Sequence, residues 1–238
     1  MKTLPFIRSF IVLTLLMFTF TACERDDPGP YRSGNQTYNY DNFDQLDMGD
    51  AFEIHVQQGS NFSIQARGDQ RNLRDLDIWA SNGTLHARYR HNRNRQYETK
   101  FDITMPSLYS VDFSGASSST IVGFNDQEKD LDVKLSGASR SEISLQARQV
   151  NADLSGASEL LVSGIATYLK ADLSGASELR GFNLTTPEAE IEASGASLAQ
   201  VKVSTYLKVK ASGDSKVRYL GNPQLNVRVS GGSQVQPD

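Results

Sequence analysis

Serine is the residue type whose repetition first suggests chemistry in this sequence of 238 residues. A Ser-Gly-x-Ser tetrad recurs seven times, starting at residues 114, 136, 155, 174, 194, 212 and 230. A nucleophilic serine would lie on a G-x-S-x-G turn that leads into a helix. The tetrads match no such turn, and seven equivalent serines cannot all be one nucleophile. We therefore predict no catalytic residue and no enzyme.

Arginine and tyrosine between residues 67 and 100 suggest that this stretch binds an acidic ligand. It holds eight Lys and Arg residues against four Asp and Glu, whereas the whole chain has a net charge of −4. The residues predicted to contact the ligand are Arg88, Tyr89, Arg90, Arg93, Arg95 and Tyr97. Guanidinium groups form charge-assisted hydrogen bonds, and they also stack on rings. An acidic polysaccharide or phosphate group fits these residues, and a solvated hairpin loop is the alternative.

Metal chemistry finds less support in the sequence. The three histidines, His55, His86 and His91, show no ligand spacing with a third donor. Aspartates recur every three residues from Asp41 to Asp50, but not in the EF-hand pattern. We expect no metal site and no cofactor, and calcium held by scattered carboxylates is the open alternative.

The N-terminus predicts export. Lys2 and Arg8 form a positive segment before an apolar run of eleven residues, Phe10 to Phe20, which is too short to span a bilayer and typical of a secretory signal. Cys23, the only cysteine, follows Thr21 and Ala22 as in a bacterial lipobox. We therefore expect residues 1–22 to be a signal peptide and Cys23 to be lipidated. An ordinary signal peptide with a chance cysteine is the alternative.

The predicted lipid would anchor the protein in the outer membrane, with the leaflet left open. Residues 23–37 are rich in Pro, Gly and polar residues, so we expect a flexible tether. Removing residues 1–22 takes away two positive charges and leaves a net charge of −6. An exported protein with an acidic body is not expected to bind nucleic acid.

The tetrads also predict the fold. Their starts advance by 22, 19, 19, 20, 18 and 18 residues, and the chain before each alternates as in Leu131-x-Val133-x-Leu135. Period two indicates strands with one apolar face, and no stretch has a helical period. Coils of this length bury their apolar faces only by stacking. We predict an all-β fold, a right-handed parallel β-helix-like solenoid at residues 113–235. Leucine-rich and propeller repeats fit less well.

The tetrad then marks the corner of each coil. Glycine permits a left-handed backbone there, and the serine hydroxyls can bond locally to the backbone. The corner glycines are Gly115, Gly137, Gly156, Gly175, Gly195, Gly213 and Gly231. Glu159 and Glu178 follow matching tetrads, so they should stack on one ladder with Arg140 and Lys216 at comparable positions. We interpret this ladder as a solvated face.

Residues 38–112 alternate like strands but lack the tetrad. Asn82-Gly83 is a strong hairpin signal, and it joins the segments around Trp79 and Leu85. We expect this part, called the cap below, to cover one end of the solenoid, where an open edge would invite aggregation.

Three sequence runs resemble one known family. They are Phe52-Glu53-Ile54-His55-Val56-x-x-Gly59, Ile103-x-Met105-Pro106-Ser107-Leu108 and the repeated Leu-Ser-Gly-Ala-Ser. Residues 38–235 resemble the auto-transporter adhesin family called the head GIN domain. The resemblance implies a β-helix-like solenoid in an exported protein of Bacteroidetes, often a lipoprotein, with a role in surface attachment. It implies no catalytic or ligand residues.

Two classes of function remain after these steps. The leading hypothesis is a lipid-anchored, non-catalytic binding or adhesion module that recognises a glycan or another envelope component. A polysaccharide-active β-helix enzyme is the rival, but the acidic residues are scattered and no long loop forms a cleft. A structural or assembly subunit, with a homo-oligomer formed through solenoid edges or faces, is a further alternative.

Overall fold

The computed structural model describes residues 29–238. The predicted signal peptide and Cys23 lie outside the described residues. The predicted all-β solenoid is confirmed. The described chain has sixteen strands that form one continuous sheet, and it has a single helix of one turn. Within residues 29–238 we find no helix with the length and apolar character needed to cross a membrane.

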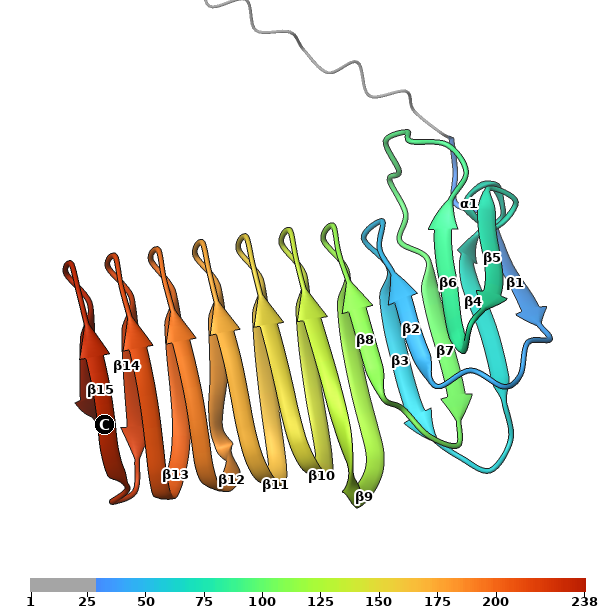
Figure 1. The fold of residues 1–238 in the computed structure, drawn as a ribbon. Coiled ribbons are helices and arrows are strands. Elements are labelled where there is room, and N and C mark those ends of the chain that lie inside the picture. Colours follow the sequence, from blue (N-terminus) through green and yellow to red (C-terminus); the bar gives the residue numbers. More distant parts are fainter. Residues whose placement is uncertain (1–28) are drawn as a thin grey trace, which may run out of the picture.

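The body of the solenoid is formed by long strands that wrap around the core. Each of β9 to β13 begins directly after one tetrad and ends directly before the next (Figure 1). Their bounds are β9 (Ser118–Leu135), β10 (Arg140–Leu154), β11 (Glu159–Leu173), β12 (Glu178–Ala193) and β13 (Leu198–Ala211). The last coil is divided into β14 (Lys216–Leu220), β15 (Gln224–Val229) and β16 (Gln234–Pro237). All these neighbours pair in parallel.

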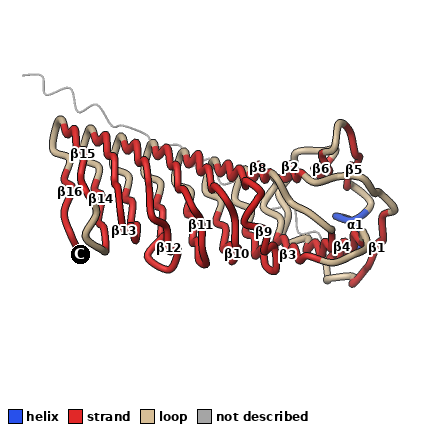
Figure 2. The backbone as a smooth tube through the Cα atoms, turned by 60° about the horizontal axis from the view of Figure 1, so that its bottom comes forward, coloured by secondary structure: helices blue, strands red, loops and turns tan. Residues whose placement is uncertain are grey.

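Parallel register places equivalent residues of successive coils on straight ladders. Val150 pairs with Leu169, which pairs with Ala189, which pairs with Leu207, and all four side chains are buried. Each apolar face is thus covered by the coils on both sides, which is the burial that the period-two pattern requires. In Figure 2 the strands of successive coils line up side by side along the body, with the cap at the other end.

The seven predicted glycines lie at the corners, with φ between +68° and +75°. At the corners from Gly137 to Gly213, the backbone N–H after the glycine donates to the glycine carbonyl of the preceding coil, as from Ala157 to Gly137 at 2.7 Å. The fourth-position serine turns inward, and Ser158 Oγ donates to the carbonyl of Leu135 at 3.3 Å. The corner serines therefore satisfy backbone acceptors inside the fold.

The cap continues the solenoid. Its elements are β1 (Ser33–Tyr38), β2 (Gln45–Met48), β3 (Glu53–Gln58), β4 (Ser63–Asp69), α1 (Gln70–Leu73), β5 (Leu76–Ser81), β6 (Thr84–Tyr89), β7 (Lys100–Met105) and β8 (Ser110–Phe113). Strands β2 and β3 stack in parallel on β8 and β9, and form one further coil without a tetrad. Asp50 and Ala51 make its corner, both with φ of 60°.

One more parallel layer follows. Strand β6 pairs with β2, and β7 pairs with β3, so β6, residues 90–99 and β7 have the arrangement of a coil. Residues 90–99 take the place of a four-residue tetrad at its corner. Antiparallel strands then cover this layer, with β5 on β6, β4 on β7 and β1 on β4. The Asn82-Gly83 hairpin is confirmed as the turn between β5 and β6.

The tether differs from the sequence-based expectation. Residues 33–37 lie in β1, which pairs antiparallel with β4 from Ser33 opposite Asp69 to Tyr38 opposite Ile64. The run Ser-Gly-Asn-Gln-Thr has no apolar residue, so alternation could not indicate a strand. Pairing of its backbone with β4 decides the conformation.

The start of the described chain is also fastened to the cap. Buried Asp69 accepts hydrogen bonds from the Arg32 backbone N–H at 2.9 Å and from the Arg71 guanidinium at 2.7 Å. The Arg71 guanidinium and the two N–H donors hold the pKa of the Asp69 carboxyl far below its usual range, although burial alone would raise it. Arg71 also donates to the carbonyl of Pro30 at 3.1 Å.

Candidate functional site

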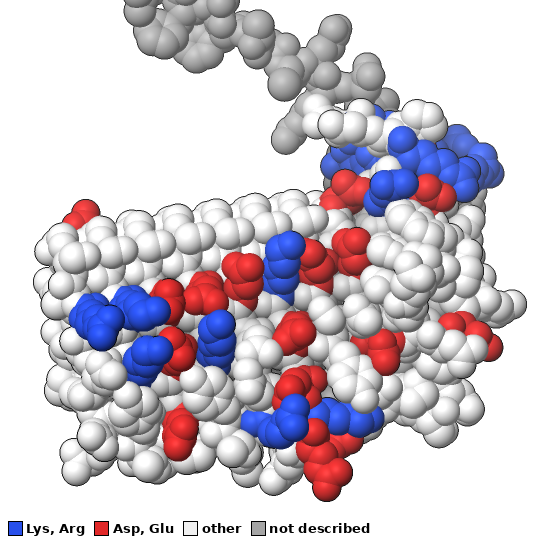
Figure 3. All heavy atoms as spheres, in the orientation of Figure 1, with Lys and Arg blue, Asp and Glu red and all other residues white. Residues whose placement is uncertain are grey.

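The basic residues of the cap gather at the expanded corner between β6 and β7. Figure 3 shows Lys and Arg side chains massed over the cap, whereas acidic and basic residues mix on the coils. A loop that replaces a tight corner can vary without disturbing the stacked core, so binding residues are readily placed there by a rigid scaffold. The structure thus positions the predicted arginines on a protruding loop and on the adjoining hairpin.

Arg88 of β6 and Arg90, which directly follows this strand, extend toward a single carboxylate. Asp77 of β5 lies 3.8 Å from Arg88 Nε and 3.9 Å from Arg90 Nε, and both arginine side chains are more than half exposed. One carboxylate cannot neutralise two guanidinium groups, so a positive charge is left on this surface. Exposed pairs at this separation are weak, and the arginines can exchange Asp77 for an external anion.

An aromatic stack supports Arg88. Its guanidinium carbon lies 4.5 Å from the centroid of the Trp79 ring, and the His86 ring stacks on Trp79 at 4.7 Å and 10°. Trp79 and His86 are directly opposite each other on β5 and β6. His86 Nδ1 in turn lies 3.0 Å from the Asp47 carboxylate. The stack restricts the conformations of Arg88 before any ligand arrives.

Asp75 organises the loop from inside. This nearly buried carboxylate pairs with Arg95, lies 2.6 Å from His91 Nδ1 and 3.5 Å from Arg93 Nη2. Burial alone would raise the pKa of Asp75, but the His91 hydrogen bond and the charges of Arg93 and Arg95 outweigh it and lower the pKa. Three loop residues thus converge on one buried anion.

Arg95 therefore differs from the prediction. Its side chain is only 11% exposed, pairs with Asp75, and its guanidinium lies 3.4 Å from the Tyr89 ring centroid. Tyr89 is held by a 2.7 Å hydrogen bond from its hydroxyl to Thr99 Oγ1. Arg95 and Tyr89 therefore stabilise the loop, because the fold places the buried Asp75 carboxylate beside Arg95 and the Arg95 guanidinium over the Tyr89 ring.

Tyr97 is also part of the scaffold. Its ring packs edge-on against Tyr31 at 5.1 Å, and its carbonyl accepts a 2.7 Å bond from Asn72 Nδ2. Of the predicted ligand residues, the structure leaves Arg88, Arg90 and Arg93 on the surface, and we call these three the arginine cluster. Sequence reasoning missed Asp77, Trp79 and His86, although alternation along the hairpin places them on the same face as Arg88.

The ladder expected from the tetrads is present. Arg140 pairs in register with Glu159, and Glu159 pairs with Glu178. Arg140 and Arg180 form ion pairs with Glu159, and Arg180 also pairs with Glu178 at 2.8 Å. The two like charges are thus bridged by arginine, and we keep the interpretation of a solvated face.

A second charged row crosses the opposite face of the coils, where Figure 3 shows it as alternating blocks of sign. In chain order it comprises Asp47, Asp112, Lys134, Asp153, Asp172, Glu192, Lys210 and Arg228. Burial raises the pKa of the Asp172 carboxyl, and acidic neighbours add to this against the opposing effect of Lys170. A shallow depression of about 420 Å³ lies beside the row. It is open to solvent and does not enclose a ligand.

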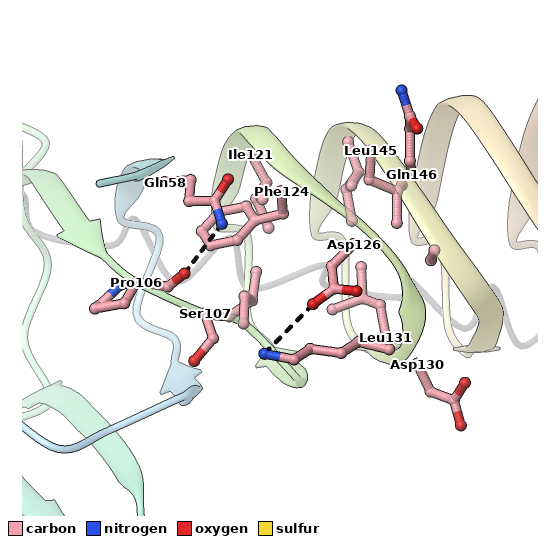
Figure 4. Close-up of a pocket in the computed structure, with 14 residues that line it drawn as sticks. Gln58, Pro106, Ser107, Ile121, Phe124, Asp126, Asp130, Leu131, Leu145 and Gln146 are labelled. Carbon is pink, nitrogen blue, oxygen red and sulfur yellow. Dashed lines mark hydrogen bonds and ion pairs between the residues drawn. The ribbon is translucent and has the colours of Figure 1, made fainter. Parts of the chain in front are cut away.

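A small pocket lies where β9 bulges away from the register of β10 (Figure 4). Buried Phe124, Leu131 and Leu145 line it together with Asp126 and Lys129, which are partly exposed and pair at 3.6 Å. Its volume is about 40 Å³, which is room for water and not for a sugar ring. Within residues 29–238, no three His, Cys, Asp or Glu side chains are grouped so that they could hold a metal ion.

Several solved structures with similar folds come from Bacteroidales. A putative adhesin from Bacteroides fragilis NCTC 9343 matches with a TM-score of 0.80 and 18% identity, over 87% of this chain and 97% of that chain. A putative adhesin from Parabacteroides distasonis ATCC 8503 matches at 0.70 and 14%, over 88% and 98%. A putative lipid binding protein from the same strain matches at 0.67 and 14%, over 87% and 96%. At these identities the likeness concerns the fold alone.

The family comparison is more direct. Among proteins with curated functions, none matches the chain. The model of one protein family, described as "Putative auto-transporter adhesin, head GIN domain", matches residues 42–223, which include most of the cap and the coils. The chain therefore belongs to the head GIN domain family of putative auto-transporter adhesins.

Proposed function

We propose that this protein is a non-catalytic binding or adhesion module of the bacterial cell envelope, and that its cap recognises an anionic glycan or a similar acidic envelope component. Family membership supports a role in attachment. The arginine cluster supports the acidic ligand, since two of its members share one distant carboxylate on a fixed hairpin. This shortage of local counter-charge is the observation that carries the proposal.

The arrangement also suits an extended binder. The coils form a rod whose corners are tight, and the only corner among the described residues that is expanded to this extent carries the arginine cluster. Charge-assisted bonds from guanidinium groups favour carboxylate, sulfate and phosphate oxygens. Charged groups at such exposed positions mainly determine specificity and association rate.

We expect the substitution of the arginine cluster by glutamine to weaken binding to acidic glycans strongly. Each charge-assisted bond contributes about 1.5–3 kcal/mol, so the triple variant Arg88→Gln, Arg90→Gln, Arg93→Gln should weaken binding at least about 30-fold. The measurement is a glycan array with uronic-acid, sulfated and neutral oligosaccharides, followed by titration of the strongest ligand at two salt concentrations. Binding should weaken as the salt concentration rises.

The matched control removes the same charge from the coils. Arg148, Arg180 and Arg218 are exposed and lie on solenoid strands outside the cap. Their triple glutamine variant should keep the affinity of the unsubstituted protein. Equal losses in both triple variants, or the absence of any acidic ligand on the array, would contradict the proposal.

We also propose that the protein is exported and anchored in the outer membrane through lipid on Cys23. The support is the sequence Thr21-Ala22-Cys23 behind a short apolar run. We expect Cys23→Ser to move the protein from the membrane fraction to the soluble fraction and to remove labelling by a fatty-acid analogue. Protease treatment of intact cells then decides the leaflet. Equal labelling of the Cys23→Ser variant would refute the anchor.

A further inference from the structure

The last coil of the described chain leaves the apolar core open. Leu225, Val227 and Val229 of β15 are 44%, 38% and 54% exposed, although they continue the ladder of Leu207, Val209 and Ala211, which are buried. This coil is the end farthest from the cap in Figure 1. Among residues 29–238, nothing is stacked on its outer side. Three exposed apolar side chains in a row at the end of a coil form a surface that can pack against another apolar surface.

The backbone of this coil is open too. Strand β15 pairs only with β13 and β16 only with β14, so in the described chain the outer edges of both strands have no partner strand. Proteins usually protect such edges with charges, prolines or bulges. Here the two strands carry one charged residue, Arg228, and one proline, Pro237. The remaining polar residues are Gln and Asn, which do not repel a second strand.

The other end of the solenoid offers no matching surface. The core there is closed by the antiparallel strands β4 and β5 and by α1, and Phe43, Ile64 and Leu73 are buried. A head-to-tail stack would need a second open end, and the cap removes it. Strands β1 and β5 of the cap also have an outer edge without a partner strand in the described chain, but the core beneath them is covered. Among the described residues, the coil of β15 and β16 is thus the one place that combines free edges with an exposed apolar row, and a second copy presents the same surface.

We propose that two copies of this chain associate tail to tail through β15 and β16, in a closed two-fold dimer with the caps at the far ends. Such an interface is self-complementary and cannot propagate into a fibre. The two-fold rotation pairs β15 with β15 of the second copy in antiparallel orientation. The inward-facing residues then continue the core from one molecule into the other.

Charge favours one register. With Val227 opposite Val227 of the second copy, Leu225 faces Val229 and Asn226 faces Arg228. No like charges are then opposite each other, and each arginine faces an amide. Because the end of one coil is smaller than a standard interface of roughly 800 Å² per partner, we expect a dissociation constant in the micromolar range. A pair of proteins that are lipid-anchored on one membrane would meet at a raised effective concentration.

Sedimentation equilibrium of the chain without its signal peptide, with Cys23 replaced by Ser, tests the proposal. We expect a monomer–dimer equilibrium, and Val227→Arg should weaken it at least tenfold because two guanidinium groups would face each other. The matched control is Ile165→Arg, which charges a similarly exposed apolar residue on an interior coil. Its equilibrium should be unchanged. Thermal unfolding of both variants checks that they are folded.

A cysteine scan tests the register independently. Directly opposite residues of antiparallel strands have Cα atoms about 4.5–5.5 Å apart, which a disulfide can span. Mild oxidation should cross-link Val227→Cys into a dimer, whereas Asn226→Cys should cross-link only when mixed with Arg228→Cys. A monomer at all concentrations, oligomers that grow beyond two, or a dimer unaffected by Val227→Arg would each overturn the proposal.

Discussion

Gly156→Ala should destabilise the protein by about 2–5 kcal/mol, because two costs combine at one corner. Gly156 has a φ of +73°, where an L-residue with a Cβ costs about 1–2 kcal/mol. Its Cβ would also lie 2.6 Å from the carbonyl oxygen of Gly137. That oxygen is fixed, since it accepts the 2.7 Å bond from the Ala157 N–H. The clash can be relieved only by separating the coils.

The measurement is denaturant unfolding followed by circular dichroism. The control is Ala157→Ser, because the third position is exposed and already holds Asp214 and Gly232 in other coils. We expect this control to stay within about 0.5 kcal/mol of the unsubstituted protein. Since stability in a solenoid depends on neighbouring coils, Gly156→Ala should also divide unfolding into two steps. A single transition with unchanged midpoint would show that the corner stack is not needed.

Asp75→Asn should release the arginine loop. The substitution removes the only negative charge that pairs with Arg95 among the described residues, and the Arg95 guanidinium is then left nearly buried without compensation. Breaking one partner of a buried pair typically costs about 3–5 kcal/mol. The stacked coils do not depend on this pair. The loss should therefore appear as local opening of residues 90–99, measured by hydrogen exchange or limited proteolysis.

The same carboxylate predicts a pH dependence. Its pKa is lower in the folded protein than the value of about 3.9 in an unfolded chain. A depressed pKa means that the stabilisation is fully present above the unfolded value and is lost as the pH falls through the folded value. The loop should thus open below about pH 4 in the unsubstituted protein, and this step should be absent in Asp75→Asn.

Asp77→Asn is the matched control for the loop. Asp77 lies two residues away, but its side chain is partly exposed and its contacts with Arg88 and Arg90 are long, so its substitution should cost less than about 1 kcal/mol. Equal opening of the loop in both variants would contradict the central role of Asp75. Because Asp77 also competes with the proposed ligand, its substitution should leave acidic-glycan binding intact or strengthen it.

The relation between sequence and structure is clearest at the corners. Gly, two serines and a small residue at intervals of 18 to 22 determine a turn of fixed shape, and alternation before each turn determines which side chains face inward. Both signals are local and repeated seven times, so they could be recognised without neighbours. The turn at Asn82-Gly83 could be predicted for the same reason.

Strands without apolar residues, and corners without the Ser-Gly-x-Ser tetrad, could not be predicted in this way. Strand β1 has no apolar alternation, and it exists because β4 offers it a backbone partner. The corner at Asp50 and Ala51 lacks the tetrad, yet it stacks directly on the corner of Gly115. In both cases the deciding contacts come from residues distant in the chain.

The same distinction between local patterns and long-range contacts applies to the candidate site. Local patterns in the sequence predict the coils, their corners and the excess of arginine between residues 67 and 100. Which arginines are available depends on contacts between distant residues, because the fold places Asp75 beside Arg95 and leaves Arg88 and Arg90 with one distant carboxylate, Asp77. The physical reason is that backbone periodicity is a local property, whereas the use of a charge depends on which opposite charge the fold brings near.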